Sequence, residues 1–262
     1  MTKKPNYKNL KRAVKDLRKK DSAHMLTEKA LEDSSKKIKF FAYSVLHDLK
    51  SPAIGLYGLT KRLNKDYSDI LDKKGQMYCE QILKTAEQIA ALVEQINVFI
   101  STKEAPLTIE KLKPKEVLQM IKEEYSAQLT IREIRWLEPD NIPEIKADRL
   151  SIIRAFRNII DNALKYGGET LSEINIKYRE SDEFHIFSVQ DNGIGLKDQV
   201  SHNDIFAPFI RSKTSRGIKG SGLGLSILRE ISERHGGEVW LEIGRDRGIT
   251  FYISISKGLK LS

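Results

Sequence analysis

The sequence predicts a multi-domain chain in which an all-α part is followed by an α+β part. Two observations define the first part: apolar residues recur at alternating spacings of three and four over residues 10–63, and again over residues 79–100. From about residue 103 onward, short apolar runs alternate with helical patterns, which indicates interleaved strands and helices. The 262 residues and 40% hydrophobic content suffice for two parts, with a real core in the second.

The first apolar seam is clear at its ends and weak in its middle. Its positions are Leu10, Val14, Leu17, Leu31, Ile38, Ala42, Val45, Leu49, Leu56, Leu59 and Leu63. Asp21, His24, Glu28 and Ser35 fall on the same phase, so the hydrophobic pattern is interrupted over residues 18–37.

The N-terminal arm is strongly basic. Residues 1–20 carry seven Lys and two Arg against one Asp, which gives +8 of the formal +9 of the chain. We interpret residues 1–37 as a solvated coiled-coil entry helix in preference to a contact with an anionic membrane or an acidic partner. No apolar run reaches transmembrane length and no secretion signal or nucleic-acid motif is present. We therefore expect a cytoplasmic chain that binds no nucleic acid, with any upstream sensor module missing or supplied by another protein.

A second, uninterrupted seam predicts another long helix, joined to the first by the polar residues 64–74. Its positions are Cys79, Ile82, Ala86, Ile89, Val93, Ile96 and Ile100. We assign residues 38–102 to an antiparallel helical hairpin whose apolar stripes two copies would bury as a dimeric four-helix bundle. A monomeric hairpin packed on its own domain is the alternative. Cys79, the only cysteine, fills the core in either case and suits a reducing cytosol.

The stretch FFAYSVLHDLKSP, residues 40–52, contains a histidine that we expect to face solvent. His47 lies about 200° around the helix axis from the seam. Asp48 can reach its imidazole, Ser51 lies one turn further on the same face, and Pro52 should bend the helix just past it. Taken alone, this stretch leaves open the alternative of an ordinary surface histidine.

The second part is predicted to begin with strands at residues 106–112 and 135–138, separated by a helix over about residues 115–130. Asp148 can cap the next helix, RLSIIRAFRNIIDNALKYGG, which ends at Gly167 and Gly168.

That helix has a polar face beside its apolar stripe. The stripe consists of Ile152, Ile153, Phe156, Ile159, Ile160, Ala163 and Leu164. Asn158, Asn162, Lys165 and Tyr166 share the neighbouring face. A solvated face would carry Lys and Glu, whereas two asparagines offer neutral oxygen ligands for Mg²⁺ and the lysine offers a cation for phosphate oxygens.

Two glycine motifs follow strands expected at residues 173–178 and 184–190. In DNGIGL, Asp191 ends a buried strand, while Gly193 and Gly195 remove side chains where a flat ring could approach the backbone. GSGLGL, residues 220–225, opens a helix whose first N–H groups are available to phosphate. Each motif alone is compatible with an ordinary turn. The second is neither a P-loop nor a dinucleotide fingerprint.

The order of these stretches resembles a known family. NIIDNALKY, DNGIG, IFAPFIR and GSGLGLSI are similar to the N, G1, F and G2 boxes of bacterial sensor histidine kinases. HDLKSP resembles the H-box of that family, which contains the phosphoacceptor histidine. The resemblance extends from about residue 38 to residue 256. It implies that residues 103–262 form an α/β sandwich ATP-binding domain of the GHKL type, with a mixed sheet on one side and three helices on the other.

The resemblance also implies roles for individual residues. Asp191 resembles the carboxylate that accepts from the adenine amino group, and Asn162 resembles the Mg²⁺ ligand, with Asn158 as a further metal contact. The complete expected ATP site comprises Asn158, Asn162, Lys165, Tyr166, Asp191, Gly193, Gly195, Phe209, Arg211, Gly220, Ser221, Gly222, Leu223, Gly224 and Leu225.

Residues 196–219 resemble the ATP lid of the family. Arg211, Lys213, Arg216 and Lys219 outnumber Asp198 and Asp204, as a cover over a triphosphate requires. Phe206 and Phe209 resemble the aromatic anchors of such a lid, although simple packing would explain them equally.

The function implied is that of a histidine kinase using ATP and Mg²⁺. His47 would be phosphorylated with Asp48 as base, and the phosphoryl group would pass to an aspartate in the receiver domain of a response regulator. Ser51 stands where the family usually has Thr, Asn or Gln, which weakens the case for phosphatase activity. Two rivals are a catalytically silent dimeric scaffold and a GHKL-type ATPase in which His47 is incidental.

Overall fold

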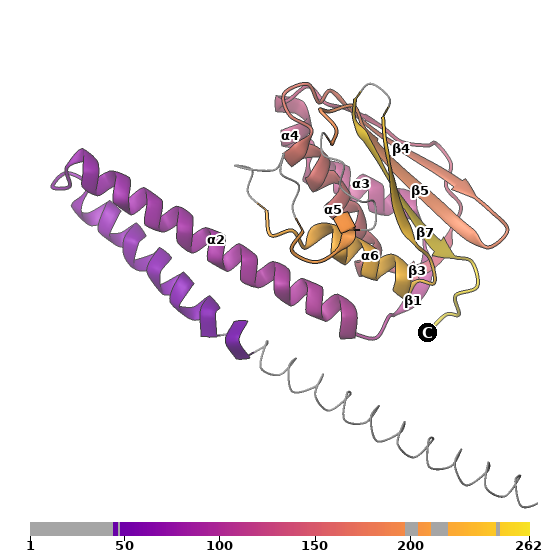
Figure 1. Cartoon of the computed structure of the whole chain (residues 1–262), viewed down its shortest axis with the longest axis horizontal. Coiled ribbons are helices and arrows are strands. Elements are labelled where there is room, and N and C mark those ends of the chain that lie inside the picture. Colours follow the sequence, from indigo (N-terminus) through magenta and orange to yellow (C-terminus); the bar gives the residue numbers. More distant parts are fainter. Residues whose placement is uncertain (1–43, 47, 197–203, 211–219, 245–246) are drawn as a thin grey trace, which may run out of the picture. The chain divides into compact units, whose positions relative to one another are not determined.

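The computed structural model describes residues 44–46, 48–196, 204–210, 220–244 and 247–262 (Figure 1). The expected entry helix over residues 1–37, His47, Arg211 and most of the expected lid lie outside the described residues. The chain divides into two units between Val93 and Glu94. Within the described ranges, no helix is both long enough and apolar enough to cross a bilayer.

The first unit consists of helical residues 44–46 and 48–67 and of most of α2, Lys73–Glu104. The connection between them is shorter than the polar stretch suggested, since the first helix continues to Tyr67. Lys65 and Asp66, which the sequence placed in the connection, are exposed residues of the helix itself. The amide of Gly75 donates to Asp72 Oδ1 over 2.7 Å, which caps the start of α2.

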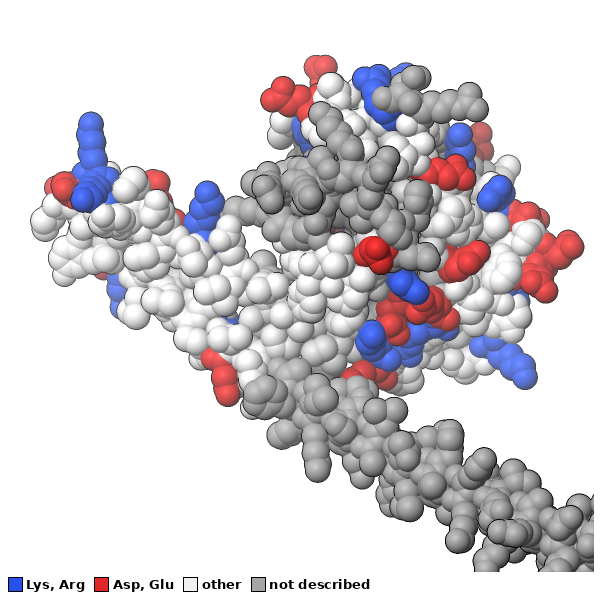
Figure 2. Space-filling view, viewed as in Figure 1, with Lys and Arg blue, Asp and Glu red and all other residues white. Residues whose placement is uncertain are grey.

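Burial in this unit recurs every seven residues along each helix. The buried positions are Leu46, Ala53 and Thr60 in the first helix and Cys79, Ala86 and Val93 in α2. Burial of Cys79 agrees with the expectation from its place in the seam. The seam residues Leu49, Leu56, Leu59 and Leu63 are exposed, so the first helix buries a neighbouring phase of its heptad instead. Figure 2 shows few charged side chains on the face of these helices turned to the viewer.

The second unit is an α/β sandwich built on a five-stranded sheet of order β2-β4-β5-β7-β6. The strands are β2 Arg135–Leu137, β4 Glu173–Glu180, β5 Phe184–Asp191, β6 Val239–Ile243 and β7 Ile249–Ser256. β2 pairs in parallel with β4 and the other pairs are antiparallel, so the sheet is mixed, as expected. A smaller antiparallel sheet pairs β1, Ile109–Leu112, with β3, Ile145–Asp148.

Helices cover one face of the large sheet (Figure 1). They are α3 Pro114–Glu124, α5 Arg149–Tyr166 and α6 Gly224–Arg234, with the short α4 Ser126–Ile131 following α3 and the 3₁₀ turn η1 at Asp204–Phe206. The Asp148 side chain caps α5 by accepting from the amide of Ser151, as the sequence suggested. Just beyond the end of α5, Gly168 has a φ of 71°, a conformation that favours glycine.

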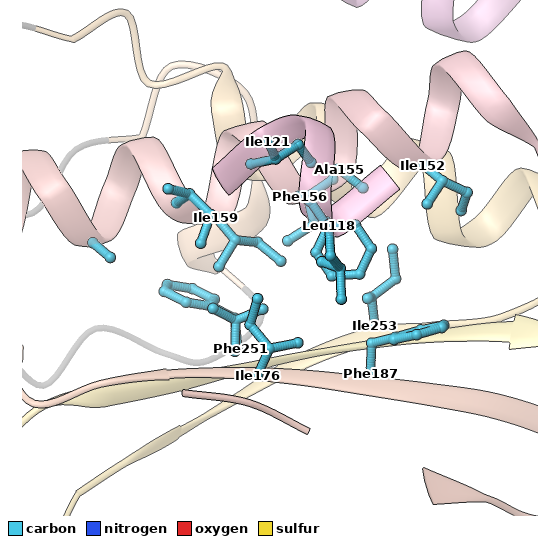
Figure 3. Packing of buried hydrophobic residues seen from close by; sticks show 14 of the residues in the cluster. Leu118, Ile121, Ile152, Ala155, Phe156, Ile159, Ile176, Phe187, Phe251 and Ile253 are labelled. Carbon is cyan, nitrogen blue, oxygen red and sulfur yellow. The ribbon is translucent and has the colours of Figure 1, made fainter. Parts of the chain in front are cut away.

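The core lies between these helices and the sheet. Figure 3 shows Ile176, Phe187, Phe251 and Ile253 of the strands facing Leu118, Ile121, Phe156 and Ile159 of α3 and α5. The rings of Phe156 and Phe187 meet edge to face with centroids 5.5 Å apart, an arrangement worth about 0.5–1.5 kcal/mol beyond area burial. Every residue of the apolar stripe expected for α5 is buried.

The opposite face of the sheet carries a second aromatic pair. Tyr252 alternates along β7 with the inward-facing Phe251 and Ile253, so it points away from the helices. Its ring stacks on that of Trp240 of β6, with centroids 4.9 Å apart. The Tyr252 hydroxyl donates to Glu242 Oε2 over 2.8 Å.

Two elements differ from the sequence expectations. The single helix expected over residues 115–130 is interrupted at Tyr125, whose buried side chain donates to Asp161 of α5 over 2.9 Å. Strand β3, directly before the helix that Asp148 caps, was not expected from the sequence.

Candidate nucleotide-binding site

A cavity of about 250 Å³ lies among α5, the end of β5 and the beginning of α6. Most of the expected ATP-site residues line it. These are Asn158, Asn162, Lys165, Tyr166, Asp191, Gly195, Gly220, Ser221, Gly222, Gly224 and Leu225. Residues from three distant parts of the sequence, 158–166, 191–195 and 220–225, therefore meet around one space.

Three further expected residues are described but do not line the cavity. Gly193 packs against Gly167, where an added Cβ would lie 2.4 Å from the Gly167 Cα. Leu223 is buried in the core next to the start of α6. Phe209 is largely exposed, with a φ of 63°, and its amide donates to the carbonyl of Gly222 over 3.0 Å.

Asp191 supplies a fixed carboxyl group to the cavity. It is the last residue of β5 and is only 6% exposed. Burial raises the pKa of this carboxyl, and hydrogen bonds from the amides of Gly193 and Ile249 offset part of that rise. The Gly193 amide lies 3.0 Å from Asp191 Oδ1. A buried carboxyl oriented by two backbone donors is well suited to accept from a ligand N–H group.

The two asparagines of α5 line the cavity, and they differ in how their amides are paired. Asn158 Nδ2 donates to the Arg154 carbonyl over 2.9 Å, and its Oδ1 would lie 2.9 Å from a Cβ added at Gly224. Asn162 Nδ2 is buried without a hydrogen-bond partner among the described residues. Leaving such a group unpaired costs about 1–3 kcal/mol, so a ligand in the cavity would relieve a specific deficit.

The side-chain oxygens of the two asparagines are also of the kind that binds Mg²⁺. Among the described residues, no group of three or more His, Cys, Asp or Glu is arranged as a metal site. An ion here would therefore be held by neutral amide oxygens together with phosphate oxygens of a ligand, a donor set that Mg²⁺ accepts. Rotation of the Asn162 amide would present its oxygen.

Asp161 lines the same cavity and was not singled out from the sequence. It accepts from Tyr125 Oη over 2.9 Å and pairs with Lys165 Nζ at 3.3 Å. Burial, and then the negative charge of Asp161, raise the pKa of Tyr125. The i,i+4 spacing of Asp161 and Lys165 was the one signal in the sequence that could have identified this carboxylate. Gln95 of α2, another residue missed, also lines the cavity.

Glycines shape the remaining walls. Gly195 and Gly222 have φ values of 70° and 75°. A Cβ at Gly220 would lie 2.7 Å from Tyr166 Oη. The first turn of α6 borders the cavity at Gly224 and Leu225, so its unpaired N–H groups are available to an anion.

The residues expected to react belong to the first unit. His47 lies outside the described residues. Asp48 and Ser51 are exposed on the first helix. The structure thus describes the surroundings of the cavity in detail and those of His47 only through its neighbours.

Comparison with known proteins agrees with the geometry of the cavity. Residues 147–258 match the family model of the histidine kinase-, DNA gyrase B- and HSP90-like ATPases. The chain is also 29% identical over 219 residues to the methanogenesis regulatory histidine kinase FilI of Methanothrix harundinacea, covering 83% of this chain and 24% of FilI. The chain belongs to the sensor histidine kinases. This histidine kinase chain is 31% identical over 235 residues to the phytochrome-like protein Cph1 of Synechocystis sp., covering 87% of the chain and 30% of Cph1.

Solved structures share the fold of this histidine kinase chain. Full-length ShkA in complex with AMPPNP superposes with a TM-score of 0.64 at 22% identity, covering 84% of this chain and 46% of ShkA. The histidine kinase ThkA in complex with the response regulator protein TrrA gives a TM-score of 0.58 at 25% identity, covering 83% of this chain and 61% of ThkA. The chain spans less than a third of the length of the relatives Cph1 and FilI.

Proposed function

We propose that this chain is an ATP-dependent histidine kinase that phosphorylates His47 and transfers the phosphoryl group to an aspartate of a response regulator. The observation that carries the proposal is the cavity, where a buried carboxyl, two asparagine amides, a lysine and the N-terminus of a helix converge. The match of residues 147–258 to a family of ATPases supports ATP as the ligand.

The cavity residues divide naturally between the two ends of ATP. Asp191 accepts from the adenine amino group and Gly195 borders the space for the ring, while Gly193 orients the Asp191 carboxyl through its amide. At the phosphate end, Lys165 supplies positive charge, and the segment Gly220–Leu225 supplies backbone N–H groups. Tyr166 lies beside the nucleotide. Phe209 and Arg211 are further ATP-binding residues that the family resemblance implies, and Arg211 lies outside the described residues.

The same site would hold a magnesium ion. Asn162 and Asn158 provide the protein ligands, and the bound ion would neutralise charge on the phosphate oxygens. The unpaired Nδ2 of Asn162 is a donor and cannot bind the ion itself, but rotation of the amide would turn Oδ1 toward it.

Transfer begins at the neutral imidazole of His47. A ring nitrogen attacks the γ-phosphorus in line, the bond from that phosphorus to its bridging oxygen breaks, and ADP leaves. Asp48 takes or holds the proton on the other ring nitrogen, a role worth about 10²- to 10⁴-fold in rate. Lys165 stabilises the charge that spreads over the phosphoryl oxygens.

Dimerisation forms part of the proposal. We assign residues 1–37 to an entry helix, residues 38–102 to a dimerisation and phosphotransfer hairpin and residues 103–262 to the catalytic domain. Support comes from an apolar stripe exposed on a single chain, formed by Leu49, Leu56, Leu59, Leu63 and Ile82. A second copy that covers this exposed stripe would complete a four-helix bundle.

The response regulator is supported by one relative. ThkA has been solved with the response regulator protein TrrA, and this chain shares 25% identity with ThkA. We assign the receiver domain of a regulator as the acceptor, with Ser51 as the residue to test for the reverse dephosphorylation. A signal from an upstream sensor module would reach the chain through its N-terminal arm.

Labelling with γ-³²P-ATP and Mg²⁺ tests the proposal. We expect the chain to gain an acid-labile, base-stable label that His47→Gln abolishes and the matched variant His24→Gln retains. Absence of label in the unaltered chain would favour a silent scaffold. Release of phosphate without labelling, unchanged in His47→Gln, would favour an ATPase in which His47 is incidental.

A further inference from the structure

The last eleven residues of α2, residues 94–104, belong to the unit that contains the cavity. We refer to them as the α2 end. Ile96, Val98 and Phe99 pack against the hydrophobic core of that unit. The α2 end is therefore part of the structure that surrounds the candidate nucleotide site.

Side chains of α6 hold the α2 end in place. Arg234 donates through Nη1 to the carbonyl of Thr102, and through Nη2 to the carbonyl of Ala105 over 2.6 Å. Glu230 Oε2 lies 3.6 Å from Lys103 Nζ. The carbonyls at the end of a helix lack partners within it and carry partial negative charge, so a guanidinium is well matched to them. We call the two Arg234 hydrogen bonds the Arg234 clasp.

The Arg234 clasp and the cavity are reached by one face of α2. Gln95 lines the cavity and precedes Thr102 by seven residues, which is close to two helical turns. The Gln95 side chain is half-buried, and no hydrogen bond joins its carboxamide to another described residue. A polar group with both donor and acceptor atoms thus lines the site, and no described residue uses its hydrogen-bonding capacity.

α6 borders both features. Its first residues, Gly224 and Leu225, line the cavity, and Arg234 at its other end holds the α2 end. The helix has eleven residues, a length of about 16 Å. One rigid element therefore fixes the position of Gln95 relative to the phosphate-binding segment.

We propose that Gln95 is a nucleotide-binding residue of this chain, placed by the Arg234 clasp, so that bound ATP fastens the α2 end to the catalytic unit. This inference rests on the proposed ATP site and adds to it a residue of α2, which lies outside the four sequence motifs named above. By linkage, whatever loosens the α2 end lowers ATP affinity, and bound ATP resists that loosening by the same factor.

Calorimetric titration of the full chain with ATP in Mg²⁺ buffer tests the role of Gln95. Gln95→Ala should weaken binding about threefold to tenfold, the range for one lost hydrogen bond. Gln95→Glu should weaken it more, because a carboxylate would face the triphosphate, and added salt should reduce that difference. Gln88→Glu makes the same change seven residues earlier on α2 at an exposed position and should leave the affinity unchanged.

A double-mutant cycle tests the role of the Arg234 clasp. Arg234→Ala should weaken ATP binding to a similar extent, and Gln95→Ala should then add less than twofold, because the glutamine is no longer held at the site. Arg229→Ala, which removes an exposed α6 arginine paired with Glu233, is the control. Unaltered affinity in both Gln95 variants, or full additivity with Arg234→Ala, would overturn the inference. Failure of the parent chain to bind ATP would instead overturn the proposed function.

Discussion

At the residue scale, two buried titratable groups of the second unit differ in whether a ligand can reach them. Asp191 is buried at a cavity that a ligand can enter, with its carboxyl oriented toward that space. His235 is fully buried with both ring nitrogens paired: Nδ1 donates to the Ile231 carbonyl over 2.7 Å, and Nε2 accepts from the Asp148 amide at 3.1 Å. The first arrangement suits binding and the second suits structure.

Asp191→Asn should separate ligand binding from stability. Because burial raises the pKa of Asp191, its ionised form destabilises the folded state as pH rises through that pKa. The amide variant should therefore be slightly more stable at neutral pH without nucleotide. It should bind ATP at least about tenfold more weakly, since an amide accepts less strongly from the adenine amino group. Urea unfolding measures the stability and calorimetric titration measures the ATP affinity. A loss of stability as large as the loss of binding free energy would contradict a binding role for Asp191.

His235 should give the fold a dependence on pH. Burial lowers the pKa of His235 below its ordinary value of 6.5, and the nearby Arg234 lowers it further, while the Ile231 carbonyl and Asp148 act in the opposite direction. A depressed pKa means that the stabilisation is complete above about pH 6.5 and is lost as pH falls through the folded-state pKa. The free energy of unfolding should fall between pH 7 and pH 5, and His235→Gln should flatten that slope. A slope unchanged in the variant would assign it to other groups.

At the element scale, the polar face of α5 depends on how the end of that helix is secured. Arg132 donates to the carbonyls of Leu164 and Gly168, both over 2.6 Å. These bonds satisfy groups at the C-terminus of α5, directly beside Lys165 and Tyr166. The sequence pattern predicted where α5 begins and ends but not this partner, which lies 32 residues before Leu164.

Arg132→Ala should destabilise the second unit by about 1–3 kcal/mol, since two carbonyls lose charged donors. Arg135→Ala is a matched control three residues away, where an exposed arginine pairs with Glu173 at 2.7 Å. Such a surface pair contributes about 0–1 kcal/mol. Urea unfolding followed by circular dichroism compares the two variants. Equal losses would show that the carbonyl contacts of Arg132 add nothing beyond a surface ion pair.

At the scale of the whole molecule, local motifs predicted the second unit better than the first. Strands 173–178 and 184–190 correspond to β4 and β5, and Asp191 stands at the end of β5, because short alternating runs specify their own geometry. The interruption at Tyr125 and the place of Gln95 follow from contacts between residues distant in sequence, which no local spacing encodes. In the first helix a heptad pattern could be seen, but the buried residues Leu46, Ala53 and Thr60 lie on a neighbouring phase of that pattern.

Dimerisation through the exposed stripe should be sensitive to one charge. Leu59 is 71% exposed on a single chain, so Leu59→Lys should leave the fold intact while raising the dissociation constant of the dimer at least about tenfold. Ile70→Lys is the control, because Ile70 is 80% exposed in the connecting turn, beyond the end of the first helix. Sedimentation equilibrium measures both. A Leu59→Lys chain that associates as strongly as the Ile70→Lys chain would contradict the proposed interface.

The position of the stacked Trp240 and Tyr252 has a practical consequence. Both tryptophans of the chain, Trp136 on β2 and Trp240 on β6, belong to the sheet of the second unit. Intrinsic tryptophan fluorescence will therefore report the melting of the sheet alone, whereas the far-ultraviolet helical signal includes the long helices as well. Recording both probes on one sample will show, without any label, whether the long helices and the sheet unfold together.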